Sequence, residues 1–569
     1  MTNEQIAAVF QQLADLLEIQ GANPFRLRAY RSAARTIQST ADSFATLVDS
    51  DSDLTEYSGI GKDLAKQIVE VAQTGQHPKL LELREQIPQG VVDMLKIQGV
   101  GPKKVAVFFN TLNLTSLDEL KAAAEAGKLA ELKGFGKKTE TSILENIGQA
   151  AAAGKRVSIS VARSSAEIIV EDLLQLDAVS QASVAGSCRR RKETCGDLDV
   201  LVTSGDHGIP MDALAEHPLV ESVLQRGETK QRVRLSSGIE MDLRVVPDES
   251  YGAALQYFTG SKEHNVVVRQ RAKKLGLKIN EYGVFRGDEQ IAGATEEDVY
   301  TAVDLPWISP ELRENRGEIQ AAENGSLPQL LTIDQIKGDL HMHTTASDGA
   351  GSIVEMAEAA KARGLKYIAI TDHSKRVSMA NGLDADRLRT HWDNIRRVNE
   401  QVNGIELLCG IECDILEDAT MDLDDAVLSE ADWVVAVLHY GLRQPREQIM
   451  KRLMCAVMNP YVKIIGHPTG RLVGRRKGAD IHMTDLLKAA ADNGVMMEIN
   501  AHPKRLDLDE INAAAARDLG IPIVISTDSH SVNGFDVLQY GVDQARRAGL
   551  SKDDVANTKT WAQFGKLLK

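Results

Sequence analysis

The chain has 569 residues and a mass of 62.0 kDa, and two or more domains are expected because a single core rarely exceeds ~250–300 residues. Hydrophobic residues make up 43% and charged residues 26%, which excludes a chain disordered throughout, and the net charge of -15 argues against binding nucleic acid over the whole surface. No apolar run is long enough to cross a bilayer, the first residues do not resemble a signal peptide, and five scattered cysteines give no disulfide framework, so we expect a cytoplasmic protein without membrane contact.

Residues 1–150 are predicted to be helical, with short glycine turns between the helices. One pattern occurs three times, as Gly59-Ile60-Gly61-Lys62, Gly99-Val100-Gly101-Pro102-Lys103 and Gly134-Phe135-Gly136-Lys137. Such a turn exposes backbone N–H groups, and the following helix N-terminus adds partial positive charge, so a phosphate can bind there. One turn would more often be a plain helix connection, but three favour contact with the DNA backbone. The candidates are Gly59, Gly61, Lys62, Gly99, Gly101, Lys103, Gly134, Gly136 and Lys137.

A basic cluster precedes the first turn. It consists of Arg26, Arg28, Arg31 and Arg35 around Tyr30. Two interpretations stay open: a solvated basic face, or a contact for a 5′-phosphate or a template strand.

From Arg156 onward, apolar strands alternate with helices, and the strand Leu198–Val202 carries the sharpest pattern of the first half. Asp197 and Asp199 lie two residues apart, so both carboxylates face the same way, and Asp242 follows on the strand Ile239–Val246. Three carboxylates on neighbouring strands can hold two Mg²⁺ ions ~3.5–4 Å apart for phosphoryl transfer. An Asp-x-Asp pair alone would more often be an exposed strand edge. The preceding Gly186, Ser187 and Arg190, which could hold a triphosphate, favour the metal site.

Residues Leu305–Leu330 are the best candidate for a linker, and after them apolar strands again alternate with helices, as in a parallel sheet or barrel.

Histidines and carboxylates lie at the ends of these strands, where an α/β barrel places its active site. The residues are His341, His343, Asp348, His373, Glu412, His439, His467, Asp528 and His530. A lone histidine is usually a packed residue, but six of the 13 histidines fall here. The mixture suits Zn²⁺, Mn²⁺ or Fe²⁺ better than Mg²⁺. His391 and His482 are interpreted as ordinary helix residues, and His502 stays unassigned.

The segment from Gly186 to Val202 resembles the nucleotidyltransferase signature of family X DNA polymerases, the family of DNA polymerase beta. The run Tyr257-Phe258-Thr259-Gly260-Ser261, with Asn265 and Arg269, resembles the thumb of that family, and the similarity spans about residues 1–310. The resemblance implies that Asp197 and Asp199 bridge two metals and that Asp242 accepts the proton of the primer 3′-hydroxyl. It implies nucleotide-binding roles for Gly186, Ser187, Arg190, Gly196, Tyr257, Phe258, Gly260, Asn265 and Arg269. The chain departs at Gln67, which stands where the lyase domain of the family has its lysine nucleophile; Lys66 is one position away.

Residues 335–569 resemble the polymerase and histidinol phosphatase (PHP) domain, a distorted (β/α)7 barrel with a trinuclear metal centre. The nine strand-end residues match its nine ligand positions. Lys375, Arg471, Arg475 and Arg476 are candidate phosphate contacts, although a solvated loop is an equal alternative for the last two.

These patterns together predict a multidomain α+β and α/β protein. The expected parts are a lyase-like DNA-binding domain (1–90), helix-hairpin-helix fingers (91–153), a nucleotidyltransferase palm (154–245), a thumb (246–310), a linker (311–334) and a PHP phosphoesterase domain (335–569). The expected function is a DNA-directed DNA polymerase that fills gaps in DNA repair and has a 3′→5′ exonuclease in the PHP domain, with 3′-phosphatase and AP-endonuclease activities as further candidates.

The expected cofactors are two Mg²⁺ or Mn²⁺ ions in the palm and up to three Zn²⁺ or Mn²⁺ ions in the PHP domain. Expected partners are dNTPs and gapped or nicked duplex DNA with a primer 3′ end, bound by a monomer. Two alternatives compete. In one, the polymerase half only holds DNA while the PHP domain turns over; in the other, the PHP domain is structural and only polymerisation occurs.

Overall fold

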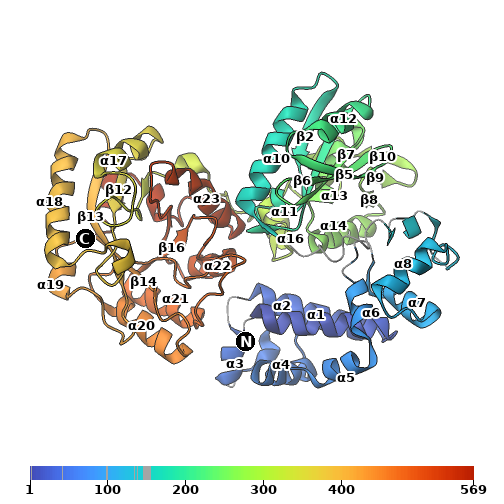
Figure 1. The fold of residues 1–569 in the computed structure, drawn as a ribbon, viewed down its shortest axis with the longest axis horizontal. Coiled ribbons are helices and arrows are strands. Elements are labelled where there is room, and N and C mark those ends of the chain that lie inside the picture. The colour runs from blue at the N-terminus through green and yellow to red at the C-terminus, as the bar shows by residue number, and fades with distance from the viewer. Residues whose placement is uncertain are drawn as a thin grey trace. The chain divides into compact units, whose positions relative to one another are not determined.

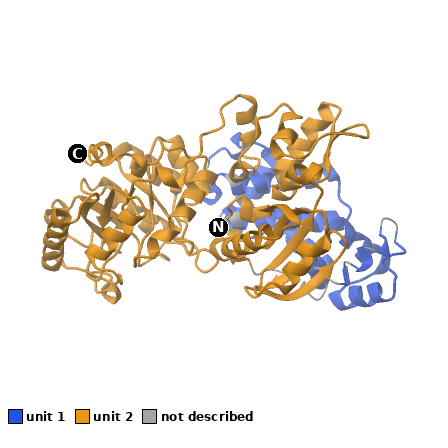
Figure 2. Ribbon diagram, turned by 90° about the horizontal axis from the view of Figure 1, so that it is seen from above, with its two compact units in different colours: residues 1–155 blue, residues 156–569 orange. Residues whose placement is uncertain are grey.

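The computed structural model describes residues 1, 3–40, 43–50, 52–95, 97, 100–132, 135–137, 139–141, 143–144 and 156–568. The chain divides into two compact units, Met1–Lys155 and Arg156–Lys569, which Figure 2 distinguishes by colour. Among the described residues, no helix combines the length and the hydropathy that crossing a membrane would need.

The first unit is helical. Its elements are α1 (Asn3–Ile19), α2 (Pro24–Ser39), α3 (Phe44–Asp49), η1 (Leu54–Glu56), α4 (Lys62–Thr74), α5 (Pro78–Gln86), α6 (Gln89–Met94), α7 (Pro102–Leu112) and α8 (Leu117–Glu125). Polar side chains start several of these helices: Asn23 accepts a hydrogen bond from the Phe25 N–H, and Ser116 accepts one from the Glu119 N–H. Phe10, Leu13 and other apolar residues form the core between the helices.

The second unit begins with a palm, a five-stranded sheet in the order β2-β4-β7-β6-β5. The strands are β2 (Val179–Val184), β4 (Asp197–Ser204), β5 (Val220–Arg226), β6 (Lys230–Leu235) and β7 (Glu240–Val245). Helix α10 (Ile159–Leu174) packs its apolar side on this sheet, and α12 (Gly208–Glu216) joins the same core. The strands β4 and β7 run parallel side by side, which places the ends of two carboxylate-bearing strands together.

Two small elements complete the palm and lead into the thumb. The short pair β1 (Val157–Ser158) and β3 (Thr194–Cys195) flanks helix α11 (Gly186–Arg189). The thumb contains η2 (Asp248–Ser250), α13 (Tyr251–Thr259), α14 (Lys262–Lys274), α15 (Glu296–Thr301) and the antiparallel strands β8 (Lys278–Asn280), β9 (Gly283–Arg286) and β10 (Glu289–Ala292).

The segment that the sequence suggests as a linker is packed rather than extended. It forms η3 (Pro310–Leu312), α16 (Glu318–Glu323) and η4 (Ile333–Gln335). Arg313 is fully buried there, where its guanidinium donates to the Ile308 carbonyl (2.8 Å) and to Glu296 Oε1 (2.6 Å). Glu318 Oε1 lies 2.7 Å from Nδ1 of the buried His264 in α14. The segment is therefore fastened to the thumb by buried polar contacts, and the domain bounds stay predictions.

The PHP region is a nearly closed barrel of seven parallel strands in sequential order (Figure 1). The strands are β11 (Gly338–Asp339), β12 (Tyr367–Ile370), β13 (Glu406–Asp414), β14 (Trp433–Val437), β15 (Ile464–Ile465), β16 (Met496–Asn500) and β17 (Ile523–Ser526). A parallel bridge between Met342 and Ser529 joins the chain after the first strand to the chain after the last. The predicted (β/α)7 architecture is thereby confirmed.

Helices cover the outside of the barrel, and alternate strand residues fill its inside. The longer helices are α17 (Ile353–Ala362), α18 (Ala385–Gln401), α20 (Arg446–Met458), α21 (Met483–Asn493), α22 (Glu510–Asp518) and α23 (Leu538–Arg547). Ile368 and Ile370 join the core beneath these helices, whereas Tyr367 and Ala369 point into the barrel. Phe564, from the short helix α24 (Trp561–Phe564), packs in the inner cluster with Tyr367. The interior is a packed core, so polar chemistry is confined to the barrel mouth.

Candidate metal centres and nucleotide pocket

Strand register places the three palm aspartates on two neighbouring strands. In the parallel pair β4 and β7, Asp199 lies opposite Asp242, and Asp197 lies opposite Glu240. The strand that carries Asp242 therefore neighbours the strand that carries the other two, as the sequence predicts. The glycine that opens α11 lies against the same group: Gly186 has φ +64°, and a Cβ there would stand 2.8 Å from Asp199 Oδ2. Only glycine fits that position without displacing the carboxylate.

The palm carboxylates have unequal electrostatic surroundings. Burial and the neighbouring charges of Asp197 and Asp242 raise the pKa of Asp199 to about 7. Burial, followed by the charge of Asp242, also raises the pKa of Asp197. For Asp242, burial acts in the same direction, but hydrogen bonds and charge from Arg232 and Lys230 outweigh it and lower the pKa. Asp197 and Asp199 are thus short of compensating positive charge, which a divalent cation could supply.

A basic clamp on Asp242 was not predicted from the sequence. Arg232 donates through Nε to Oδ1 (2.6 Å) and through Nη2 to Oδ2 (2.8 Å), and Lys230 Nζ lies 2.8 Å from Oδ2. The register of β6 and β7 places Arg232 opposite Asp242. The sequence pattern that could have predicted this clamp is the spacing of Lys230, Arg232 and Arg234, which lie two residues apart on one strand and so place three cations on one face of the sheet.

The donor set of the triad fits Mg²⁺ or Mn²⁺, since all its donors are carboxylate oxygens. Among the described residues, its three carboxylates do not reach within 4.8 Å of one another, in contrast to the histidine groups below. Arg232 and Lys230 hold both oxygens of Asp242 on the side of β6. A third carboxylate ligand therefore requires this clamp to loosen.

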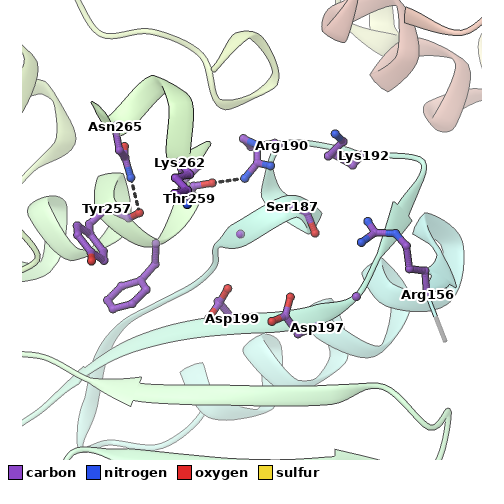
Figure 3. Close-up of a pocket in the computed structure, with 14 residues that line it drawn as sticks. Arg156, Ser187, Arg190, Lys192, Asp197, Asp199, Tyr257, Thr259, Lys262 and Asn265 are labelled. Carbon is purple, nitrogen blue, oxygen red and sulfur yellow. Dashed lines mark hydrogen bonds between the residues drawn. The ribbon is translucent and has the colours of Figure 1, made fainter. Parts of the chain in front are cut away.

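A cavity of about 490 Å³ lies in front of the two β4 aspartates (Figure 3). Eight of the nine predicted nucleotide-binding residues line it: Gly186, Ser187, Arg190, Gly196, Tyr257, Phe258, Gly260 and Asn265. Arg269 does not line the cavity; its Nε donates to the Asn265 carbonyl (3.2 Å), and its guanidinium lies 5.7 Å from the Tyr257 ring centre. Three basic residues in the lining were not predicted, Arg156, Lys192 and Lys262. The cavity therefore combines carboxylates on its floor with cations around its rim, as binding of a metal–triphosphate complex requires.

The three glycine turns share one hydrogen-bond pattern. In each, the apolar residue between the glycines donates its N–H to the carbonyl three positions earlier: Ile60 to Tyr57 (3.1 Å), Val100 to Ile97 (3.0 Å) and Phe135 to Leu132 (3.0 Å). Gly61 precedes α4 and Gly101 precedes α7, so both helices begin as predicted. The side chains of Lys62, Lys103 and Lys137 are exposed, while Gly99 and Gly134 lie outside the described residues.

The residues around the expected lyase position have other partners. Gln67 Oε1 lies 2.9 Å from Nε2 of the buried His77, and Lys66 is exposed one position earlier on α4. In the basic cluster, Arg31 forms ion pairs with Asp15 and Glu18, both at 2.7 Å. Arg26, Arg28 and Arg35 are exposed, which leaves three of its four cations on the surface.

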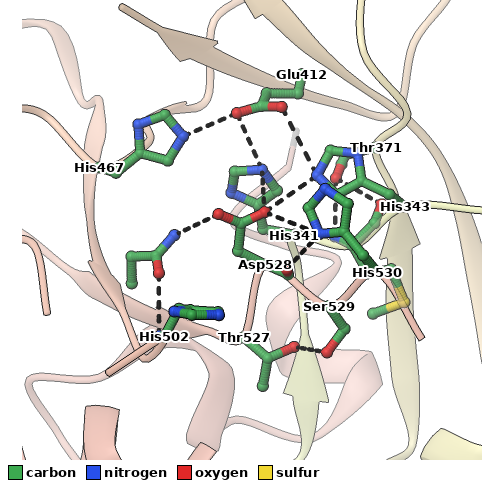
Figure 4. Close-up of polar contacts among 12 residues, drawn as sticks. His341, His343, Thr371, Glu412, His467, His502, Thr527, Asp528, Ser529 and His530 are labelled. Carbon is green, nitrogen blue, oxygen red and sulfur yellow. Dashed lines mark hydrogen bonds and ion pairs between the residues drawn. The ribbon is translucent and has the colours of Figure 1, made fainter. Parts of the chain in front are cut away.

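The PHP barrel gathers all nine predicted side chains at one mouth. Figure 4 shows His341, His343, Glu412, His467, Asp528 and His530 of this set. The nine side chains form four overlapping groups whose donor atoms lie within 4.8 Å of one another: His343, Asp348, His373 and His530; His341, Glu412 and His467; His341, His343 and Asp528; and His373, Glu412 and His439. Glu412, His341, His343 and His373 each belong to two groups. Shared ligands of this kind suit a cluster of several ions rather than isolated ions.

The chemistry of these donors fits metal binding. Among the described residues, the buried Nδ1 atoms of His343 and His467 have no hydrogen-bond partner. Other donors face only a member of the same set: His373 Nδ1 lies 2.6 Å from Glu412 Oε2, and His341 Nε2 lies 3.2 Å from Glu412 Oε1. A buried polar atom without a hydrogen-bond partner is costly, and a cation would satisfy it. The mixed imidazole and carboxylate set favours Zn²⁺ or Mn²⁺.

Further carboxylates orient the ligands from behind. Glu498 Oε1 lies 2.8 Å from Nδ1 of His341, and Asp414 Oδ2 lies 2.9 Å from Nδ1 of His439. Such partners fix the ring orientation of a ligand histidine. The sequence pattern that could have found them is a carboxylate on a strand near its carboxyl end: Asp414 ends β13, and Glu498 lies two residues before the end of β16.

His391 also serves the site indirectly. Its Nε2 lies 2.8 Å from Oδ2 of the buried Asp372, which also accepts hydrogen bonds from Thr344 and Ser347 in the loop before Asp348. His502 stays outside the four groups.

The mouth has an exposed edge and a buried floor. The side chains of Asp348 and His530 are 35% and 42% exposed, whereas Glu412 and His467 are buried. Burial lowers the pKa of His373, but Glu412 and Asp348 outweigh it and raise the pKa to about 10. Because Asp348 and His530 form the exposed edge, a phosphoester would approach the metal site from their side.

The phosphate contacts suggested by the sequence have different surroundings. Arg471 donates to Glu193 of the palm (2.7 Å), while Lys375 and Arg475 are exposed.

Comparison with known proteins agrees with these two sites. Family models match for a helix-hairpin-helix domain (residues 1–77), a SAM-like helix-hairpin-helix tandem (91–148), a DNA polymerase beta palm (159–249), a DNA polymerase beta thumb (254–314) and a PHP domain (339–502). A probable phosphatase of Thermoanaerobacter sp. is 32% identical over 39% of this chain and 89% of its own length. DNA polymerase lambda of Rattus norvegicus is 26% identical over 55% of this chain and 56% of its own.

A third relative aligns from end to end. The DNA polymerase/3′-5′ exonuclease PolX of Bacillus subtilis is 39% identical over 573 aligned residues, which cover both chains completely. With this likeness over its full length and with both polymerase and PHP models matched, the chain belongs to the family X DNA polymerases that carry a C-terminal PHP domain.

Proposed function

We propose that the protein is a DNA polymerase that fills short gaps during DNA repair and that its PHP domain removes nucleotides from 3′ ends. The observation that carries the polymerase part is the register of β4 and β7, which places Asp242 opposite Asp199, and Asp199 with Asp197 lines a cavity rimmed by cations. The observation that carries the nuclease part is the set of nine donors at the barrel mouth.

In the palm, Asp197, Asp199 and Asp242 would hold two Mg²⁺ or Mn²⁺ ions. Bound there, the ions neutralise charge on the phosphates and on the attacking oxygen. Ser187, Gly186, Gly196 and Arg190 bind the triphosphate, and the Tyr257–Gly260 turn lines the sugar. Arg232 and Lys230 engage both carboxylate oxygens of Asp242. Asp242 therefore accepts the proton of the primer 3′-hydroxyl only after this clamp has opened. Asn265 contacts the incoming base, and Arg269, which packs behind Asn265 and Tyr257, contacts the templating pair.

In the PHP domain, the nine donors would hold up to three Zn²⁺ or Mn²⁺ ions. Bound there, the ions supply an activated water and polarise the phosphoryl group. Glu498 and Asp414 keep His341 and His439 oriented, and the exposed side of Asp348 and His530 receives the 3′ end. The same chemistry would remove a 3′-phosphate or cut beside an abasic site.

The protein would bind gapped or nicked duplex DNA through its glycine turns. The exposed Lys62, Lys103 and Lys137 and the bare N–H groups of α4 and α7 contact phosphates without reading sequence. We expect a monomer that acts in the cytoplasm.

One experiment separates this proposal from its alternatives. The full-length protein receives a gapped duplex and Mn²⁺, with and without dNTPs, as wild type, as Asp197→Ala/Asp199→Ala and as His341→Ala/His343→Ala. The proposal requires the first variant to lose only extension and the second to lose only resection. Wild-type resection without extension would support the DNA-holding alternative, and extension without resection would support a structural PHP domain.

A further inference from the structure

One short loop supplies two of the cations at the nucleotide cavity. The loop Arg190–Glu193 links α11 to β3, and its residues Arg190 and Lys192 line the cavity (Figure 3). Arg191 between them has φ +58°, a left-handed conformation that is unfavourable for a residue with a side chain. Such a conformation persists only where surrounding contacts enforce it. The contacts that hold this loop therefore decide where the two cations stand.

The PHP domain contacts both ends of the loop. At the first end, Arg547 of α23, with a side chain only 1% exposed, donates through Nη1 to the Arg190 carbonyl at 2.6 Å. At the second end, Arg471 donates through Nη2 to Glu193 Oε2 at 2.7 Å. Each arginine is itself fixed within the PHP domain, Arg547 by Glu510 Oε1 (2.6 Å) and Arg471 by the Arg505 carbonyl (3.0 Å).

Glu314 links the same arginine to the side chain of Arg190. Its Oε1 accepts from Arg547 Nη1 (3.2 Å) and from Arg190 Nε (3.0 Å), while Arg190 Nη1 donates to the Thr259 carbonyl (2.5 Å). Arg190 is thus held at its backbone carbonyl by Arg547 and at its guanidinium by Glu314, which also contacts Arg547.

The basic residues around Glu314 and Glu510 outnumber these two carboxylates and favour an anionic ligand. Arg190, Lys192, Arg547 and Arg316 are gathered around two carboxylates, Glu314 and Glu510. The positive excess lies beside the cavity, where the phosphates of a nucleotide would balance it.

We propose that Arg547 and Arg471 are positioning residues of the polymerase reaction, through which the PHP domain sets the nucleotide-binding loop Arg190–Glu193. They touch no substrate; they act by holding Arg190 and Lys192 where the β- and γ-phosphates of the dNTP bind. The inference rests on the proposed function of the cavity and adds that this site is built by two domains.

A third PHP residue, Asp543 of α23, also reaches the loop, with its Oδ1 3.8 Å from Nε of Arg191. An arginine of the same helix that does not reach the loop provides a control. Arg546, the neighbour of Arg547 on α23, donates to Glu311 Oε1 (2.9 Å) and to the Leu331 carbonyl (2.9 Å). Arg546→Met therefore removes a cation from the same helix without touching Arg190 or Glu193. Glu193→Gln weakens the contact to Arg471 from the palm side and leaves the PHP domain unchanged.

The test compares Arg547→Met, Glu193→Gln and Arg546→Met with the wild type in the full-length protein. Single-nucleotide gap filling gives KM for the dNTP, kcat and the inhibition constant of pyrophosphate. Equilibrium binding of the dNTP to a complex with a dideoxy-terminated primer gives affinity without turnover. Resection in the absence of dNTPs reports whether the PHP barrel is intact.

We expect Arg547→Met and Glu193→Gln to raise KM about tenfold and to leave kcat within about twofold, since Arg547→Met removes the donor to the Arg190 carbonyl and Glu193→Gln removes the charge that Arg471 contacts. Pyrophosphate inhibition should weaken by the same factor, while Arg546→Met stays near the wild type in all three constants. A loss of folded enzyme alone would lower the apparent kcat and leave KM and the pyrophosphate inhibition constant unchanged.

Equal constants for Arg547→Met and Arg546→Met would overturn the inference, as would a higher KM with unchanged pyrophosphate inhibition. If Arg547→Met does not fold, Glu193→Gln decides by the same criteria. A wild type that extends no primer would instead refute the proposed function, and the binding measurement would still show whether the loop depends on Arg547 and Glu193.

Discussion

Replacement of Glu296 by glutamine should destabilise the thumb strongly. The carboxylate is 5% exposed and accepts from Arg189 (2.7 and 2.8 Å), from the fully buried Arg313 (2.6 Å) and from the Trp307 indole N–H (3.0 Å). Burial raises its pKa, but the two arginines outweigh burial and lower it from 4.5 to about 2. Glutamine keeps the shape of the protonated acid and removes the charge. It also leaves Arg313 buried without its counter-charge.

The magnitude follows from that pKa. A pKa lowered from 4.5 to about 2 corresponds to about 3 kcal/mol of folding free energy at pH 7. Because the folded pKa lies below the unfolded one, this stability is fully present above pH 4.5 and is lost as the pH falls toward 2. At pH 3.5, the difference between wild type and Glu296→Gln should shrink to about 2 kcal/mol.

Urea unfolding followed by tryptophan fluorescence measures this difference. Trp307 contacts Glu296 directly, and the other three tryptophans lie in the PHP domain. Glu297→Gln is the matched control, since Glu297 is the next residue on α15 and is exposed. The reasoning is refuted if the two variants unfold at the same urea concentration, or if the deficit of Glu296→Gln does not decrease on acidification.

Three further outcomes are expected. Borohydride should trap no adduct between the wild type and an incised abasic site, because Gln67 cannot form a Schiff base; an adduct lost in Lys66→Ala would contradict this. Arg232→Gln should lower stability by about 3–5 kcal/mol, since it leaves Asp242 less neutralised. Mg²⁺ should then raise the unfolding midpoint of Arg232→Gln more than that of the wild type, and equal shifts would argue against the clamp. Mn²⁺ should raise the thermal midpoint of the wild type more than that of His341→Ala/His343→Ala, as calorimetry can determine.

Patterns at strand ends explain why much of both sites could be predicted. Parallel strands of a barrel end at one face, so the position of His341 or Asp528 in the sequence already gives its place in space. Likewise, Asp197 and Asp199 need only an alternating strand to face the same way.

The side-chain contacts that could not be predicted depend on which strands become neighbours and on the register between them. Arg232 meets Asp242 across β6 and β7, and nothing in either strand alone specifies that pairing. Glu498 and Asp414 likewise became partners of histidines only once the barrel had closed. The proline and asparagine residues near Leu305–Leu330 suggest a linker, and nothing in that segment alone indicates that the buried Arg313 pairs with Glu296, 17 residues earlier in the thumb.

The closure of the barrel has a consequence for synthesis of the protein. His343 and Asp528, which stand 3.2 Å apart, are separated by 185 residues, and the bridge from Met342 to Ser529 needs both ends of the domain. On the ribosome, the palm and thumb are complete long before residue 530 emerges, and domains generally fold as they are made. A nascent or prematurely terminated chain therefore has its palm and thumb without Arg547, so the nucleotide-binding loop is set only after α23 has been made.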